Sequence, residues 1–237
     1  MSENILHPFA SPEWMTTPFE LVPKTFFDEL VDLLFLAQKC LARADQLMRN
    51  GVNDCNKMDK TLHTWISGAM SLQHAWLQRY VSTIQLSEGH PPVVPQRTAS
   101  LSTCPEHLDI TYTTVSAAAL ISLYHTVNLL LLRLLQPQQE YIVRIQRHAE
   151  AILFANDFVL SAPGPSAEFG PVMMLLQLKV ASLWGAPSAE RIAAESALQR
   201  HRMRYGGLMS VFDTEGGYFA DLAAWVLSNA TASSCAT

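Results

Sequence analysis

The residues best suited to chemistry lie in one strongly apolar run, residues 112–136. A histidine, His125, stands among the leucines of this run, and Tyr124, Asn128 and Arg133 lie near it. An imidazole changes its charge near neutral pH, so His125 can act as a general base if the run lines an enclosed pocket. A single histidine in a core also commonly serves only as a hydrogen-bonding group, and the sequence leaves both interpretations open. If the chain is an enzyme, these four residues are the first to test as catalytic groups.

Metal and cofactor sites are not expected. A protein zinc site draws its ligands from closely spaced cysteines and histidines. The eight histidines include no His-x-x-x-His pair, and the four cysteines are far apart, at positions 40, 55, 104 and 235. Asp28 and Asp32 lack the spacing of the magnesium-binding aspartate motif of isoprenoid cyclases, and we interpret them as a solvated helix face. No G-x-S-x-G nucleophile motif occurs either.

The composition is typical of an ordered chain with a large core. Hydrophobic residues make up 49% of the 237 residues and charged residues 16%. The formal charge is −5, and phosphate binding needs clustered lysine and arginine, so we expect no direct binding of nucleic acid. A basic cluster at 200–204 closes a predicted helix, where cations favour the helix dipole. Since no signal peptide is recognisable, we expect a nuclear or cytoplasmic protein that is not secreted.

The apolar run at 112–136 is long enough to cross a membrane. Four polar side chains interrupt it, however: Ser122, His125, Asn128 and Arg133. Polar groups are costly in lipid, and no asymmetry of lysine and arginine flanks the run. We therefore interpret it as the central buried helix of the fold, with a semi-polar seam on one side, and expect no membrane insertion.

Hydrophobic spacing of three and four residues predicts helices along most of the chain, and no segment alternates with a period of two. The buried stripe predicted for the first helix is Phe26, Phe27, Leu30, Leu33, Leu34, Ala37, Leu41, Ala44 and Leu47, and that for the second is Leu62, Trp65, Ile66, Ala69, Leu72, Ala75, Trp76, Tyr80, Val81 and Ile84. We expect about seven helices, at roughly 26–50, 59–87, 112–136, 139–160, 171–184, 189–205 and 218–227. The predicted fold is all-α, an irregular helical array that forms a single domain over residues 24–228. Four prolines in residues 1–23 predict an extended arm, and residues 229–237 a disordered tail.

Two of these predictions concern particular side chains. Pro171 is well placed in the first turn of the helix that runs to 184, and this helix is apolar on nearly every side, which predicts burial all round. Large aromatic and methionine side chains are either core residues or the lining of an apolar pocket, and their helical spacing favours the core. They are Trp65, Met70, Trp76, Tyr80, Tyr124, Met173, Met174 and Trp184.

Four segments follow one another in an order that carries a resemblance to a known family. They are 65–77 ahead of a proline-rich loop, the Leu-Tyr-His-Thr helix at 117–135, the His-Ala-x-x-Ile-Leu helix at 147–160 and the Phe-x-Pro and Glu-Arg-x-x-Ala helices at 169–206. Together they span more than half of the chain. In this order the chain resembles the carboxy-terminal regulatory ("fungal-specific") domain of fungal zinc-cluster transcription factors.

The chain departs from that family in lacking the six closely spaced cysteines of the zinc cluster, the basic linker and the coiled coil. What the resemblance implies is a regulatory module that is tied to a fungal secondary-metabolite gene cluster and has no DNA-binding motif of its own. It would bind a protein partner or a small-molecule effector, either as the regulatory half of a factor or as a stand-alone derivative. A homodimer remains open.

The alternative is an enzyme of the same pathways. The excess of apolar residues and the missing DNA-binding head suit a cofactor-independent cyclase or isomerase that uses an apolar pocket in the same helical fold. Of the two, we favour the regulatory module and keep the enzyme as the alternative.

Overall fold

The structure, a computed structural model, describes residues 13, 16–50, 60–87, 112–135, 139–163, 166–185, 189–205, 221–224 and 226. Regular structure in these ranges is helical and includes no strand, which confirms the all-α prediction. Eight helical elements are defined, close to the expected seven. They are the 3-10 helix η2 (Thr17–Phe19) and the α-helices α2 (Phe26–Arg49), α3 (Lys60–Ser87), α4 (Val115–Leu134), α5 (Gln139–Ser161), α6 (Ser166–Met173), α7 (Leu175–Trp184) and α8 (Ala189–Arg204).

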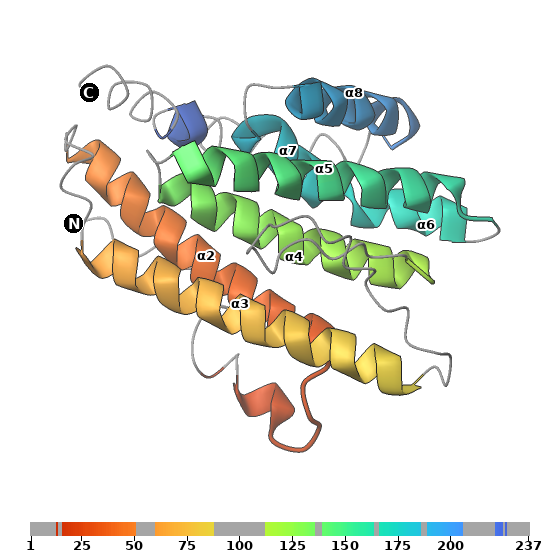
Figure 1. Cartoon of the computed structure of the whole chain (residues 1–237), viewed down its shortest axis with the longest axis horizontal. Coiled ribbons are helices and arrows are strands. Elements are labelled where there is room, and N and C mark those ends of the chain that lie inside the picture. The colour runs from red at the N-terminus through yellow and green to blue at the C-terminus, as the bar shows by residue number, and fades with distance from the viewer. Residues whose placement is uncertain are drawn as a thin grey trace.

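The helices form layers around α4 (Figure 1). The long helices α2 and α3 lie side by side at one face, and α6, α7 and α8 lie toward the other, beyond α4 and α5. Helix α4 packs against α2, α3, α5, α6 and α7. A helix surrounded in this way must be apolar on nearly every side, as the sequence of α4 is.

Helix α4 begins later than the apolar run that predicted it. Thr114 has an extended backbone, and its side chain accepts a hydrogen bond from the backbone N–H of Ala117 at 3.1 Å, so the helix starts at Val115. Sixteen of its twenty residues are buried. Among the described residues it is also the one helix long and apolar enough to cross a membrane, and 78% of its most apolar window is buried inside the protein.

The start of α2 shows what one of the amino-terminal carboxylates does. The Thr25 hydroxyl accepts from the backbone N–H of Asp28 at 3.3 Å, and the Asp28 carboxylate accepts from the backbone N–H of Thr25 at 2.9 Å. This is a capping box, and the hydrogen bonds from Thr25 lower the pKa of Asp28. The predicted stripe is buried at Leu30, Leu33, Ala37, Leu41 and Ala44.

Three members of the predicted stripes are exposed instead of buried. Phe27 on α2 is 53% exposed and Leu72 on α3 is 54% exposed, and Ala75 on α3 is exposed as well. The positions that α3 buries instead include Gln73 and Leu77. A three-to-four spacing allows more than one stripe on a long helix, and only the neighbouring helices decide which stripe is covered.

The helix expected from 171 to 184 is two helices. Helix α6 begins at Ser166, so Pro171 lies inside it, and the chain turns at Met174 before α7 starts. The N–H of Met174 donates to the carbonyl of Pro171 at 3.1 Å. Proline has no N–H and its ring crowds the preceding turn, which favours a break nearby. Met173 is exposed at this break, against the prediction of burial on every side. Gly185 ends α7 as predicted.

The chain ends are described only in part. Residues 17–19 of the predicted extended arm form η2 instead, and Lys24 lies over the Phe19 ring with its Nζ 4.8 Å from the ring centroid. Of the predicted last helix, residues 221–224 and 226 are helical, and Leu222, Ala223 and Val226 are buried. Residues 1–12, the predicted loop at 89–107 and the predicted tail lie outside the described residues.

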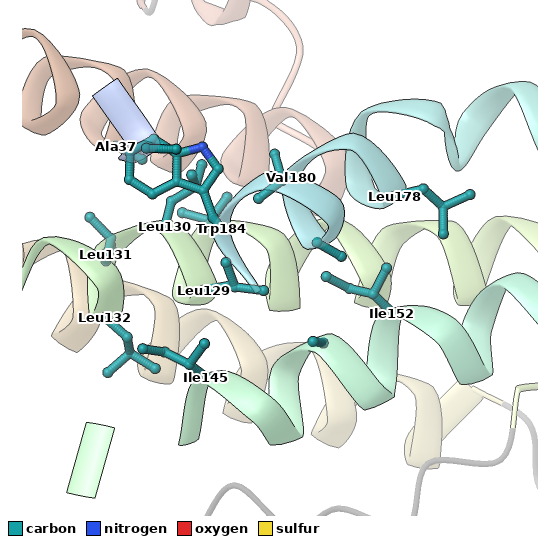
Figure 2. Packing of buried hydrophobic residues seen from close by; sticks show 14 of the residues in the cluster. Ala37, Leu129, Leu130, Leu131, Leu132, Ile145, Ile152, Leu178, Val180 and Trp184 are labelled. Carbon is teal, nitrogen blue, oxygen red and sulfur yellow. The ribbon is translucent and has the colours of Figure 1, made fainter. Parts of the chain in front are cut away.

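The main core surrounds the middle of α4. Figure 2 shows leucines of α4 packed between side chains of the flanking helices α2, α5 and α7. The labelled members are Ala37, Leu129, Leu130, Leu131, Leu132, Ile145, Ile152, Leu178, Val180 and Trp184. Leucines at four consecutive positions are all buried, so this part of α4 faces other helices around its whole circumference.

A second, aromatic cluster joins α2, α3 and α4. The Trp76 ring stacks on Tyr80 and on Tyr124, with ring centroids 5.0 and 5.9 Å apart. The indole N–H of Trp76 donates to the carbonyl of Phe26 at 2.9 Å, so the polar edge of the ring is satisfied as well. These aromatic residues therefore belong to the packed core.

Two glycines provide a test of this packing. A Cβ on Gly170 in α6 would lie 2.6 Å from Val159 Cγ1 and 2.9 Å from Val115 Cγ1, whereas a Cβ on Gly68 in α3 would meet nothing within 4 Å. We expect Gly170→Ala to lower the free energy of unfolding by about 1–3 kcal/mol, because valine side chains are short and stiff and cannot move aside cheaply. Gly68→Ala should raise it by about 0.5–1 kcal/mol, since alanine favours a helix.

Urea unfolding followed by circular dichroism measures both changes. Gly68→Ala is the matched control, being the same substitution in a helix without the contact. A Gly170→Ala protein as stable as the wild type would contradict the close approach of α6 to α4 and α5.

Candidate functional site

The predicted candidate base, His125, meets a second histidine inside the protein. Its Nδ1 lies 2.8 Å from Nδ1 of His148 on α5, and both side chains are buried. One Nδ1 must donate and the other accept. The pair links α4 to α5 through a hydrogen bond between two buried side chains.

Burial determines the charge of His148. Desolvation, with a smaller effect of Arg144, lowers the pKa of His148 to about 3, so the ring is neutral near physiological pH. The Nε2 atom of His148 is buried and has no hydrogen-bond partner within the described part of the chain. His148 is 3% exposed and so has little access to solvent protons.

A second polar contact crosses from α5 to α8. The Nε2 atom of His201 lies 3.1 Å from Oδ1 of Asn156, and both side chains are buried. Desolvation, and then Arg200 and Arg204, lower the pKa of His201. The sequence showed His201 only as a member of the basic cluster at 200–204, and Asn156 was not singled out.

Of the other predicted site residues, only Tyr124 has a ring contact with His125, with the ring centroids 5.3 Å apart. Tyr124 also stacks on Trp76 of α3, and Asn128 donates from Nδ2 to the carbonyl of Tyr124 at 3.0 Å. Arg133 donates from Nε to the carbonyl of Trp184, the last residue of α7. His125 and Arg133 are eight residues apart, about 12 Å along the helix axis. The structure therefore pairs His125 with His148 but does not bring the four predicted residues together.

One feature of the sequence signals the histidine pair. His148 lies three residues after Ile145 and four before Ile152, on the buried stripe of α5. Its place on that stripe predicts burial, but the match with His125 depends on how α5 aligns with α4, and the sequence does not give that alignment.

What this arrangement can do chemically follows from its burial. The Nδ1–Nδ1 contact is a hydrogen bond between two rings with little exposed surface, and His148, whose pKa is lowered to about 3, takes up no proton near neutral pH. The described residues contain no group of three or more histidine, cysteine or acidic side chains placed to hold a metal ion. At three of the four predicted positions, His125, Asn128 and Arg133, the polar side chain forms a hydrogen bond inside the core.

Comparisons of the chain with protein-family models, with curated proteins and with solved structures find no match. The resemblance to the regulatory domain of fungal zinc-cluster factors therefore stays a prediction from the sequence.

The depressed pKa of His148 predicts acid sensitivity. In the unfolded chain a histidine titrates near about 6.5, and in the folded protein His148 titrates near about 3. Between these values only the unfolded state binds the proton, so stability is fully present above about pH 6.5 and falls as the pH decreases toward 3. One such group contributes a slope of up to about 1.4 kcal/mol per pH unit, and His201 acts in the same direction.

We expect His148→Phe to lose less stability than the wild type between pH 6.5 and pH 4.5. Its slope of unfolding free energy against pH should be smaller by up to about 1.4 kcal/mol per pH unit, the effect of one proton. The measurement is the free energy of unfolding by urea at intervals of half a pH unit. His63→Gln, on the exposed face of α3, is the control and should keep the wild-type slope. Equal slopes for His148→Phe and the wild type would refute the buried neutral state of His148.

Proposed function

We propose that the chain is a transcription-factor-like regulatory module that binds a protein partner or a small-molecule effector and acts on a fungal secondary-metabolite gene cluster. The order of its helical segments, which resembles that of zinc-cluster regulatory domains, motivates the proposal. In this role the chain has no DNA-binding motif of its own, acts in the nucleus and depends on other proteins for its place on a promoter.

The proposal rests on one observation: the polar side chains of α4 form hydrogen bonds to different parts of the bundle. His125 contacts α5, Arg133 contacts the end of α7, and Asn128 bonds to the carbonyl of its own preceding turn. A catalytic site requires such groups to converge on one reacting atom. Here they diverge and serve the packing of the bundle, as expected of an interaction module.

Exposed apolar side chains give further support. Phe154 on α5 and Phe169 and Met173 on α6 are exposed, and α5 and α6 are in contact. Large exposed apolar groups on neighbouring elements are typical of surfaces that bind other proteins.

A cofactor-independent cyclase or isomerase is the second candidate. The observation that favours it is the His125–His148 pair, because the contact with His148 orients the ring of His125, the predicted general base, inside the protein. This candidate requires that His125 be essential for a chemical product.

A reporter assay separates the two candidates. With the chain fused to an unrelated DNA-binding domain in a fungal reporter strain, we expect the reporter transcript to change at least about threefold relative to the DNA-binding domain alone, because a module brings its partner to the promoter. Phe154→Ser combined with Phe169→Ser should weaken this effect, since loss of two anchoring aromatic groups costs several-fold in affinity. Ile192→Ser, which alters an exposed apolar residue of α8, is the matched control.

His125→Phe provides the opposite test. If the chain is a module, a folded His125→Phe protein keeps its effect on the reporter. An unchanged reporter with the wild-type fusion, together with loss of a pathway product in a His125→Phe strain, would reject the module and support the enzyme.

A further inference from the structure

Three helix ends meet where α4 finishes. Arg133 lies in the last turn of α4, and its Nε donates to the carbonyl of Trp184 at the end of α7. After four more residues the chain begins α8, at Ala189. Arg133 is 3% exposed, so its guanidinium lies inside the protein at this corner.

A second arginine lies at the same corner. Arg191 is in the first turn of α8, and its Cβ is 3.7 Å from the position that a Cβ would take on Gly185, the residue after Trp184. Burial, and then the charge of Arg191, lower the pKa of Arg133 to about 10, a value at which it is still charged near neutral pH. Arg133 reaches the carbonyl of Trp184 and Arg191 lies beside the next residue, Gly185, so both cations border the end of α7.

Neither arginine forms an ion pair with a carboxylate of the described residues. The nearest acidic residue in sequence, Glu190, accepts a hydrogen bond from Nε2 of Gln146 at 3.4 Å. The Nη2 atom of Arg133 is buried and lacks a hydrogen-bond partner in the ranges that the structure describes. A buried cation without a counter-charge is strongly unfavourable, and here a like charge lies beside it.

We propose that Arg133 and Arg191 bind an oxyanion, the phosphate or carboxylate group of a small molecule, at the N-terminus of α8. A guanidinium group matches the paired oxygens of such a group, and the contact with Trp184 occupies Nε while Nη2 of Arg133 has no partner among the described residues. Helix α8 has sixteen residues, and its first N–H groups and its dipole favour a negative charge at this end. The oxyanion would supply a counter-charge for Arg133 and Arg191, neither of which pairs with the Glu190 carboxylate of the same turn.

The proposal does not depend on the regulatory function. The proposed anion site is separate from the His125–His148 pair and from the exposed apolar side chains of α5 and α6. The competing explanation is that Arg133 serves only as a cap for the carbonyl end of α7, in which case no anion binds.

Thermal unfolding in sodium phosphate tests the proposal. For the wild-type chain we expect a saturable rise of the melting temperature above that in sodium chloride of equal ionic strength, by about 3–6 °C at ten times the Kd. Arg191→Gln should lose this additional rise, because it removes one of the two cations. Arg200→Gln, an exposed arginine near the other end of α8, is the matched control and should respond as the wild type does.

Calorimetric titration with phosphate and with acetate provides a direct readout and distinguishes the two sources of the oxyanion. We expect one site per chain for at least one of them, with binding at least about tenfold weaker in Arg191→Gln and in Arg133→Lys, which keeps the charge but loses the fork. A rise of the melting temperature equal in the wild type and in Arg191→Gln would be a general salt effect and would overturn the proposal. Absence of a saturable signal with both anions would overturn it too.

Discussion

Burial of α4 on all its sides is the constraint on which the rest of the structure depends. A twenty-residue helix that is apolar all round cannot face water, and five other helices pack against it. The hydrophobic effect stabilises this arrangement without specifying which helix lies where. The other helices are arranged around that central helix. Helix α2 pairs with α3 at one face, and α7 pairs with α8 at the other.

The polar side chains of α4 give the packing its specificity. A buried polar group without a hydrogen bond costs about 1–3 kcal/mol, so each one restricts which neighbour α4 can accept. His125 requires the ring of His148 on α5, and Arg133 requires the carbonyl end of α7. The semi-polar seam that distinguishes α4 from a membrane-spanning helix thus also fixes its alignment with its neighbours.

Not every buried group is satisfied. Gln73 of α3 is wholly buried, and both of its amide atoms lack partners among the described residues. In the described ranges Nη2 of Arg133 also lacks a hydrogen-bond partner. A ligand, an ordered water or local strain accounts for such groups in native structures. An anion is the ligand that we propose at Arg133, whereas Gln73 is neutral and gives no reason to expect an ion.

By itself the sequence determined the fold class, the number of helices to within one, and most of their bounds. These properties depend on local periodicity, on capping residues and on the length of an apolar run, all of which can be read without knowing the neighbours. The sequence also identified α4 as the centre, because its long apolar run leaves only a semi-polar seam on one side. Its error at Pro171 was local as well, since a proline fits either a first turn or a break.

The tertiary structure alone decided which side chains meet. His148 and His125 are 23 residues apart, and Arg133 and Trp184 are 51 apart, so each contact depends on how two helices align along their axes. Helical periodicity places a residue on a face but does not say what faces it, and for that reason Phe27 and Leu72 were assigned to the core in error. The same reason explains why four polar residues close in sequence on α4 serve different neighbours. A helix turns about 100° per residue, and in a bundle every direction around α4 leads to a different part of the chain.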